Sequence, residues 1–321
     1  MKKTVFIMMI AVIFAFLLCG CNRTSESDSK EGTVSIVATT FPGYDFARAV
    51  AGDNAEITML LSPGEESHSF DPTPTDIIKI EKSDLFIYVG GESDAWVEEI
   101  LDSFESEYLT VFPMMEKVSL YEEEEKEGMM EERGEEHESN VQEEETEYDE
   151  HIWTSPVNAI ILVNGICDTL CEKDPKNADE YRKNAESYVS ELEKLDSEFR
   201  STVKNAKRKT LLFGDRFPFL YFVREYGLDY FAAFPGCSSE TEPNAATIAF
   251  LIDKANEERI PVILMESMSN GNIANAIGEE TGGKVLSLYA CHNISAEDFE
   301  NGETYLSLMR KNLLVLKEAL N

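Results

Sequence analysis

Short apolar runs alternate with amphipathic helical patterns through the first half of the chain. Runs rich in Val, Ile and Phe predict strands, and segments with apolar residues three and four apart predict the helices between them. The predicted strands are residues 33–39, 55–61, 84–90 and 108–113, and the predicted helices are 42–52, 74–83 and 94–104. Strands joined by helices of this length form βαβ units, so the pattern predicts a parallel sheet covered by helices.

The same alternation returns in the second half, after a loop at 151–155 and a helix that begins near Pro156. Predicted strands are 209–215, 228–236, 260–266 and 284–290, and predicted helices are 217–227, 243–259, 270–283 and 302–321. Between the halves, residues 175–206 keep apolar side chains on one helical face, which predicts a single helix roughly 45 Å long. The predicted fold class is therefore α/β, with two parallel-sheet lobes joined by one long rigid helix.

Two segments do not fit this alternation, and the first is the N-terminus. Lys2 and Lys3 precede an apolar run that ends in "LCGC", which is the pattern of a secretory signal peptide over residues 1–20. The sequence "LCGC", residues 18–21, matches a bacterial lipobox. This match predicts lipid attachment at Cys21 and a polar tether over residues 21–32. A plain signal peptide and an uncleaved signal anchor are the alternatives.

The second exception is an acidic segment, residues 122–150, with 16 acidic and two basic side chains. Such a composition cannot bury an apolar core, so disorder is predicted for the whole segment. The expected domain plan is an N-terminal lobe at 33–174 that contains this segment, a linking helix at 175–207 and a C-terminal lobe at 208–321.

Charge narrows the classes of ligand that the chain can bind. The sequence has 62 acidic and 28 basic residues, a formal net charge of −34. Proteins bind nucleic acids through basic patches, so a chain this acidic is not expected to bind them. Strong negative charge is compatible with a cationic ligand or a salty exterior.

Four cysteines follow the tether. Cys167 and Cys171 lie four residues apart in a predicted helix, where buried thiols are the expected state. Cys237 and Cys291 fall in loops of the second half, and an extracytoplasmic location would allow a disulfide between them. The sequence leaves that disulfide and two free thiols as open alternatives.

The four histidines carry the main chemical signal. In open parallel α/β sheets, ligands bind beyond the carboxyl ends of the strands. His68, His151 and His292 all fall in such strand-end loops, whereas His137 lies in the acidic segment. A single histidine is more often a surface or core residue, but two from the first lobe and one from the second, converging on one cleft, suit Zn²⁺ or another first-row ion. A metal site in the cleft between the lobes is predicted.

Four stretches make the resemblance to a known family specific. "SPGEESHSFDPTPTDI", "DEHIWTSPVNAIILVNGI", "FPGCSSETEPNAATIAFLI" and "GETYLSLMRKNL" resemble the zinc- and manganese-uptake solute-binding lipoproteins of ABC transporters. The resemblance runs from about Thr33 to the C-terminus and is interrupted only by the acidic segment. It implies two α/β lobes bridged by one helix, with the metal between them. It also implies a bacterial protein, lipid-anchored outside the cytoplasm, that acts as a monomer with a membrane permease.

The resemblance also implies metal ligands. His68 matches the first family histidine and His151 the second. The third family ligand is a histidine or glutamate in the segment that here reads "GDRFPFLYFVREYGL", where Asp215 is the only acidic candidate near the right place. Asp215 pairing with Arg216, or capping a helix, is the alternative.

The fourth family position, a carboxylate after the last strand, is replaced here by His292. Glu240 and Glu266 are further candidates on second-lobe loops, with hydrogen bonding or capping as the alternative role for each. Three imidazoles with at most one carboxylate favour Zn²⁺, whereas a second carboxylate would favour Mn²⁺.

The expected function is capture of extracytoplasmic Zn²⁺ and its delivery to an ABC permease, without catalysis. A manganese-specific member of the same family is the first alternative. A secreted zinc hydrolase that uses the same histidines, and an adhesin on the cell surface, are two further alternatives.

Overall fold

The computed structural model describes residues 33–65, 70–104, 108–129, 147–237 and 243–321, and its large compact unit is Val34–Asn321. Four predicted features lie outside the described residues: the signal peptide with Cys21, His68, His137 and Glu240. Within the described residues, no helix is both long and apolar enough to span a lipid bilayer.

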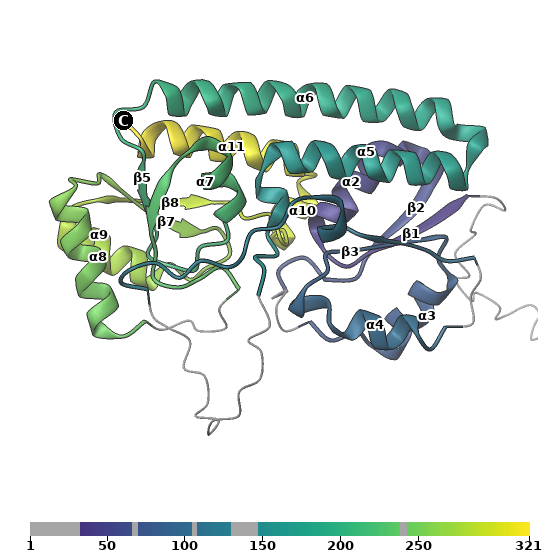
Figure 1. Ribbon diagram of the computed structural model, residues 1–321, viewed down its shortest axis with the longest axis horizontal. Helices are drawn as coiled ribbons and strands as arrows, with labels where there is room; N and C mark the ends of the chain where they lie inside the picture. The colour runs from purple at the N-terminus through teal and green to yellow at the C-terminus, as the bar shows by residue number, and fades with distance from the viewer. Residues whose placement is uncertain (1–32, 66–69, 105–107, 130–146, 238–242) are drawn as a thin grey trace, which may run out of the picture. The chain divides into compact units, whose positions relative to one another are not determined.

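The N-terminal lobe is built on a four-stranded sheet, as predicted (Figure 1). Its strands are β1 (Val34–Ala38), β2 (Ala55–Met59), β3 (Leu85–Tyr88) and β4 (Thr110–Pro113), in the order β2-β1-β3-β4 with every pair parallel. The helices that follow the first three strands are α2 (Phe41–Ala51), α3 (Pro74–Lys82) and α4 (Trp96–Leu101). Parallel register places the carboxyl ends of all four strands at one edge of the sheet.

The C-terminal lobe contains two parallel strand pairs. These are β5 (Thr210–Leu212) with β6 (Asp229–Phe231), and β7 (Val262–Glu266) with β8 (Lys284–Leu288). A parallel bridge between Phe213 and Leu264 links the pairs, so the sheet continues from β5 to β7. Its helices are α7 (Leu220–Tyr226), α8 (Ala245–Glu257), α9 (Asn272–Thr281), α10 (Ala296–Glu300) and α11 (Tyr305–Ala319).

One helix, α6 (Ala178–Lys204), runs past helices of both lobes (Figure 1). It packs against α2 and α5 (Pro156–Lys173) of the N-terminal lobe and against α7 and α11 of the C-terminal lobe. Its buried stripe includes Tyr181, Leu192 and Phe199, the apolar face that the sequence predicts. The predicted combination of α/β lobes and one long helix is confirmed.

A buried carboxylate joins this helix to both lobes. Asp45 of α2 accepts hydrogen bonds from the Tyr188 hydroxyl of α6, at 3.1 Å, and from the backbone N–H of Tyr305 at the start of α11, at 3.0 Å. Arg48 completes the charge pair at 2.8 Å. Apolar side chains from both lobes also form one continuous core, so the lobes share packing.

Parts of the acidic segment are ordered, contrary to the prediction for 122–150. Glu122 forms an antiparallel bridge with Tyr148. Glu124 pairs with Arg224 of α7 at 3.1 Å, and Lys126 pairs with Asp229 of β6. The composition of the segment shows only its charge. It does not show that side chains of the C-terminal lobe form ion pairs with it. Residues 130–146 lie outside the described residues.

All four cysteines of the described lobes are thiols in the structure. Cys167 is buried and Cys171 is half-buried, as expected for a helical pair. Cys237 and Cys291 are not joined, so the disulfide alternative is not the one found in this structure. Burial raises the pKa of the Cys291 thiol well above its usual range, which keeps it protonated.

Candidate metal site

A small, partly open cavity of about 20 Å³ lies where strand-end loops of both lobes meet. That volume is room for about one water molecule or ion. The cavity is lined by Thr39, Thr40, Leu61, Phe70, Val89, Ser93, Asp94, Glu150, His151, Trp153 and His292. The loops after β1, β2 and β3 supply one wall, and the loop after β8 supplies His292. The cavity therefore occupies the ligand position that the sheet topology predicts.

Two of the three predicted histidines face each other in this cavity. The rings of His151 and His292 have centroids 6.3 Å apart and planes at 81°. Both residues are buried, with exposed fractions of 1% and 7%. The structure thus brings together histidines that are 141 positions apart in the printed sequence.

Hydrogen bonds to backbone carbonyls hold the His292 loop in place. The indole N–H of Trp153 donates to the carbonyl of Ala290 at 2.8 Å, which ties the His151 loop to the His292 loop. The N–H of Phe41 donates to the carbonyl of His292 at 3.3 Å. Cys291 has a positive φ of 62°, a conformation that non-glycine residues seldom adopt, and it turns the chain just before His292.

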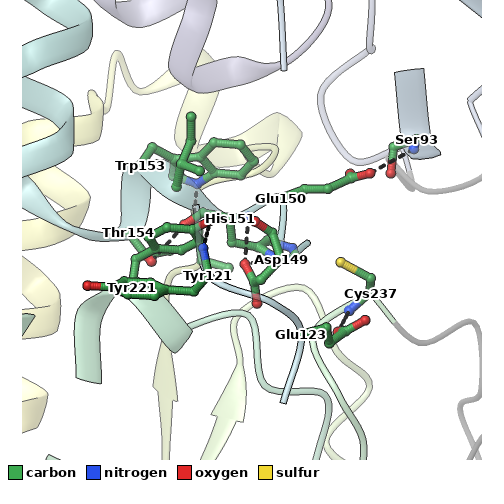
Figure 2. Close-up of polar contacts among 12 residues, drawn as sticks. Ser93, Tyr121, Glu123, Asp149, Glu150, His151, Trp153, Thr154, Tyr221 and Cys237 are labelled. Carbon is green, nitrogen blue, oxygen red and sulfur yellow. Dashed lines mark hydrogen bonds and ion pairs between the residues drawn. The ribbon is translucent and has the colours of Figure 1, made fainter. Parts of the chain in front are cut away.

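Asp149 orients His151. Its Oδ1 accepts the backbone N–H of His151 at 2.8 Å and lies 3.3 Å from the ring Nδ1 (Figure 2). A carboxylate at Nδ1 fixes the tautomer and leaves Nε2 as the metal-binding nitrogen. Burial lowers the pKa of His151, but the charge and hydrogen bond of Asp149 outweigh it, and the net pKa is raised.

Tyr221 of α7 holds Asp149 in place from the second lobe. Its hydroxyl donates to the carbonyl of Asp149 at 2.9 Å and accepts the N–H of Tyr121 at 3.1 Å. Nearby, Glu123 accepts the backbone N–H of Cys237 at 2.8 Å (Figure 2). The two described ends of the acidic segment, which we call its stems (residues 122–129 and 147–150), are thus fixed beside His151.

Replacing Asp149 by alanine is expected to weaken zinc binding by about 10- to 100-fold, the usual effect of removing a carboxylate that supports a ligating imidazole. Competition with a chromophoric chelator measures the affinity. Asp53→Ala is the control, because Asp53 is an exposed carboxylate in the turn before β2. Equal affinities in the two variants would show that Asp149 does not act through His151.

The described residues on either side of His68 lie close to the cavity or to the His292 loop. Phe70, two residues beyond His68, lines the cavity. On the other side, the side-chain amide of Asn293 donates to the carbonyls of Ser62 and Glu65, each at 2.8 Å. Asn293 is the neighbour of His292, so residues Ser62 and Glu65, just before the segment with His68, are tied to the His292 loop.

Asp215 and Glu266 are not among the residues that line the cavity. Asp215 Oδ1 accepts the N–H of Arg216 at 3.1 Å. Glu266 accepts the Ser267 hydroxyl at 2.9 Å and the N–H of Met268 at 2.7 Å. The contacts of Glu266 are the hydrogen-bonding role that the sequence offers as its alternative to ligation, whereas the Asp215 bond is to the backbone of Arg216.

Among the described residues, no three His, Cys, Asp or Glu side chains are grouped closely enough to hold a metal ion. His151 and His292 are a pair that needs at least one further ligand. His68 remains the predicted third ligand, and its assignment is a proposal.

The buried carboxyl of Glu266 predicts a pH-dependent stability. Burial raises its pKa to about 7, so the folded protein holds this proton more tightly than the unfolded chain. The stability from this group is complete below about pH 4.5 and is lost as the pH rises through about 7. Glu266→Gln is expected to remove up to about 3 kcal/mol of this decline. Urea unfolding of both forms at pH 5 and pH 8 measures it, and identical declines would refute the assignment.

Sequence reasoning misses several residues of the cavity wall. Asp149 and Glu150 immediately precede His151 in "DEHIW", and that adjacency is a signal that they could reach the same site. No comparable local motif marks Thr39, Thr40 and Asp94. Their place in the cavity wall follows only from the parallel register of β1 and β3.

Burial raises the pKa of Asp94 to about 7, and the hydrogen bonds that it accepts from the N–H groups of Gly90 and Val89 oppose this rise.

Comparison with known proteins decides the family. The family described as "Zinc-uptake complex component A periplasmic" matches residues 36–319 of the chain. The chain belongs to this family. It is a family of solute-binding proteins, which accounts for the two lobes and for histidines at their junction.

Individual members are similar over nearly the whole chain. The chain is 31% identical to the high-affinity zinc uptake system protein ZnuA of Bacillus subtilis, covering 99% of this chain and 98% of ZnuA. It is also 31% identical to the zinc-binding lipoprotein AdcA of Streptococcus pneumoniae over 97% of its length, but spans only 60% of AdcA. The Zn(II)-bound ZnuA-like domain of that AdcA superposes with a TM-score of 0.73 at 30% identity, covering 90% of this chain and 99% of the domain.

Proposed function

We propose that the protein captures Zn²⁺ outside the cytoplasm and delivers it to an ABC-type uptake permease. The observation that carries this proposal is the facing pair of buried imidazoles, His151 and His292, in a cavity of about the size of one ion. The names of the family and of its members ZnuA and AdcA support zinc as the cargo.

The spacing of the two rings supports a small closing movement on binding. With Zn–N bonds of about 2.0–2.1 Å and tetrahedral geometry, two imidazoles on one ion have centroids roughly 5 Å apart. The observed 6.3 Å is wider, so the rings approach when the ion enters. Because α6 and a continuous core join the lobes, loop and side-chain movements suit this closure better than a large hinge.

The ligand chemistry favours zinc over manganese. Neutral imidazole is a preferred ligand of Zn²⁺, whereas Mn²⁺ prefers carboxylates and water. Three histidines, namely His68, His151 and His292, are the proposed ligands. Asp215 and Glu266 are proposed to stay outside the coordination sphere, because neither lines the cavity.

The remaining parts of the proposal rest on the sequence. Lipid attachment at Cys21 would hold the protein on the outer face of the cell membrane, where it would act as a monomer beside the permease. The protein is proposed to bind its cargo without catalysing a reaction, in keeping with a solute-binding family.

Metal titration of the purified protein tests this function. Calorimetry with Zn²⁺ and with Mn²⁺ is expected to give one tight zinc site and weaker manganese binding, and His68→Ala is expected to weaken the zinc site. Tighter binding of Mn²⁺, or the absence of any saturable zinc site, would overturn the proposal. Full zinc affinity in His68→Ala would remove His68 from the ligand set.

A further inference from the structure

Two thiols lie one turn apart in the C-terminal half of α5, away from the residues that line the metal cavity. Cys167 and Cys171 are four positions apart, so their side chains share one face of the helix. Cys167 is 5% exposed and Cys171 is half-buried. A hydrogen bond joins the two side chains, so the sulfur atoms are direct neighbours.

The helical spacing allows the two sulfurs to share an ion more readily than to bond to each other. Residues four apart on a helix have Cβ atoms about 5–6 Å apart, whereas a disulfide needs about 3.5–4.5 Å. Both cysteines are free thiols in the structure. An ion between the sulfurs lengthens the bridge by one atom, which the spacing accommodates without distortion of the helix backbone.

The number of donors selects the class of ion. Within the part of the chain that the structure describes, no group of three His, Cys, Asp or Glu side chains is placed to hold a metal, so the pair has no third ligand of these types. Zn²⁺ takes four ligands in a closed site and is poorly served by two. Thiolates favour soft ions, among them Cu⁺. Because Cu⁺ and Ag⁺ form linear complexes with two thiolates, two sulfurs satisfy either ion.

The surroundings of the thiols restrict which ions can displace their protons. Burial raises the pKa of the Cys167 thiol to about 12, and the neighbouring Cys171 and Asp168 add to the rise, whereas Arg182 opposes it. Such a thiol loses its proton at neutral pH only to an ion that binds sulfur strongly. Hard ions such as Ca²⁺ and Mg²⁺ prefer oxygen ligands and are excluded.

Neighbouring groups of α6 offer access and a counter-charge. The Cys171 thiol donates to the carbonyl of Ala178, the first residue of α6, at 3.5 Å, and its half-buried sulfur is the side from which an ion can arrive. A monovalent ion with two thiolates carries one net negative charge. Arg182, an exposed cation on α6, is near enough to Cys167 to act on its charge and can offset that of the complex.

We propose that Cys167 and Cys171 form a binding site for one Cu⁺ ion, held in linear coordination by the two thiolate sulfurs. On binding, two S–H bonds break, two Cu–S bonds form and two protons pass to solvent, while copper keeps its oxidation state. The site is separate from the cavity of His151 and His292. It goes beyond the proposed zinc function and does not depend on it.

Anaerobic titration of the full chain with Cu⁺, in competition with a chromophoric Cu⁺ chelator, tests the site. Cys171→Ser is expected to bind Cu⁺ about 100-fold or more weakly than wild type, because one of two ligands is lost. Cys237→Ser is the matched control, since it also removes a half-buried thiol, and its Cu⁺ affinity is expected to equal that of wild type. Thermal unfolding by circular dichroism checks that both variants are folded, and Cys167→Ser is expected to repeat the loss.

X-ray absorption at the copper edge identifies the ligands in the wild-type protein. Two sulfur neighbours and no nitrogen neighbour are expected at the tight site. Nitrogen neighbours, or three or more sulfurs, would place Cu⁺ elsewhere and overturn the inference. Equal Cu⁺ affinity in wild type and in a folded Cys171→Ser variant, or a loss in Cys237→Ser as large as in Cys171→Ser, would also overturn it.

Discussion

Replacing His151 by alanine is expected to reduce zinc affinity by about 100- to 1000-fold. Four-ligand zinc sites bind with about 10–16 kcal/mol, so each ligand contributes roughly 3–4 kcal/mol. The ring of His151 is held by Asp149 at Nδ1 and contacts the Trp153 ring edge-on. Chelator competition on the purified variant measures the loss.

His137→Ala is the matched control, because it removes a histidine from the acidic segment and leaves the predicted ligand set unchanged. Its affinity is expected to equal that of wild type. If His151→Ala loses less than the roughly tenfold lower limit for a residue that only supports a ligand, His151 is not bound to the ion.

Asp45→Ala is expected to destabilise the protein by about 2–5 kcal/mol, because two donors each lose their acceptor at a cost of about 1–3 kcal/mol. The Asp45 side chain is 1% exposed. Its loss leaves the Tyr188 hydroxyl and the Tyr305 N–H without their acceptor. Because these donors lie on α6 and α11, the lost hydrogen bonds are those that join the two lobes. Urea unfolding monitored by circular dichroism measures the change.

Asp179→Ala is the control for this prediction. Asp179 lies on the same long helix α6, but its side chain is fully exposed and pairs only with Arg182 among the described ion pairs. Its removal is expected to change stability by no more than about 0.5 kcal/mol. A loss below about 1 kcal/mol in Asp45→Ala would show that the network does not hold the lobes together.

The fold follows from the sequence because apolar periodicity reports burial directly. The runs around Ile36 and Phe86 are apolar because β1 and β3 are central strands, and the stripe through Tyr181 and Leu192 is the buried face of α6. The ends of helices and strands are harder to predict from the sequence. Helix α6 begins at Ala178, because Pro175–Asn177 form a separate 3₁₀ turn. The ordered stems of the acidic segment depend on partners such as Arg224, which composition cannot reveal.

The site could be predicted only in part, for a related reason. His151 and His292 follow from the rule that ligands meet at strand ends. The alternative roles of Asp215 and Glu266 depend on local hydrogen bonds, which the sequence does not specify. The place of Thr40 in the cavity wall could not be predicted, because a threonine before a helix normally indicates a cap, and only the geometry shows that its side chain forms none.

A crystal structure of the zinc-loaded protein, with anomalous diffraction recorded at the zinc edge, would locate the bound ion. We expect one strong peak between the rings of His151 and His292, within about 2.0–2.1 Å of a nitrogen of each and of His68. A zinc peak elsewhere in the chain, or one that contacts neither His151 nor His292, would contradict this expectation.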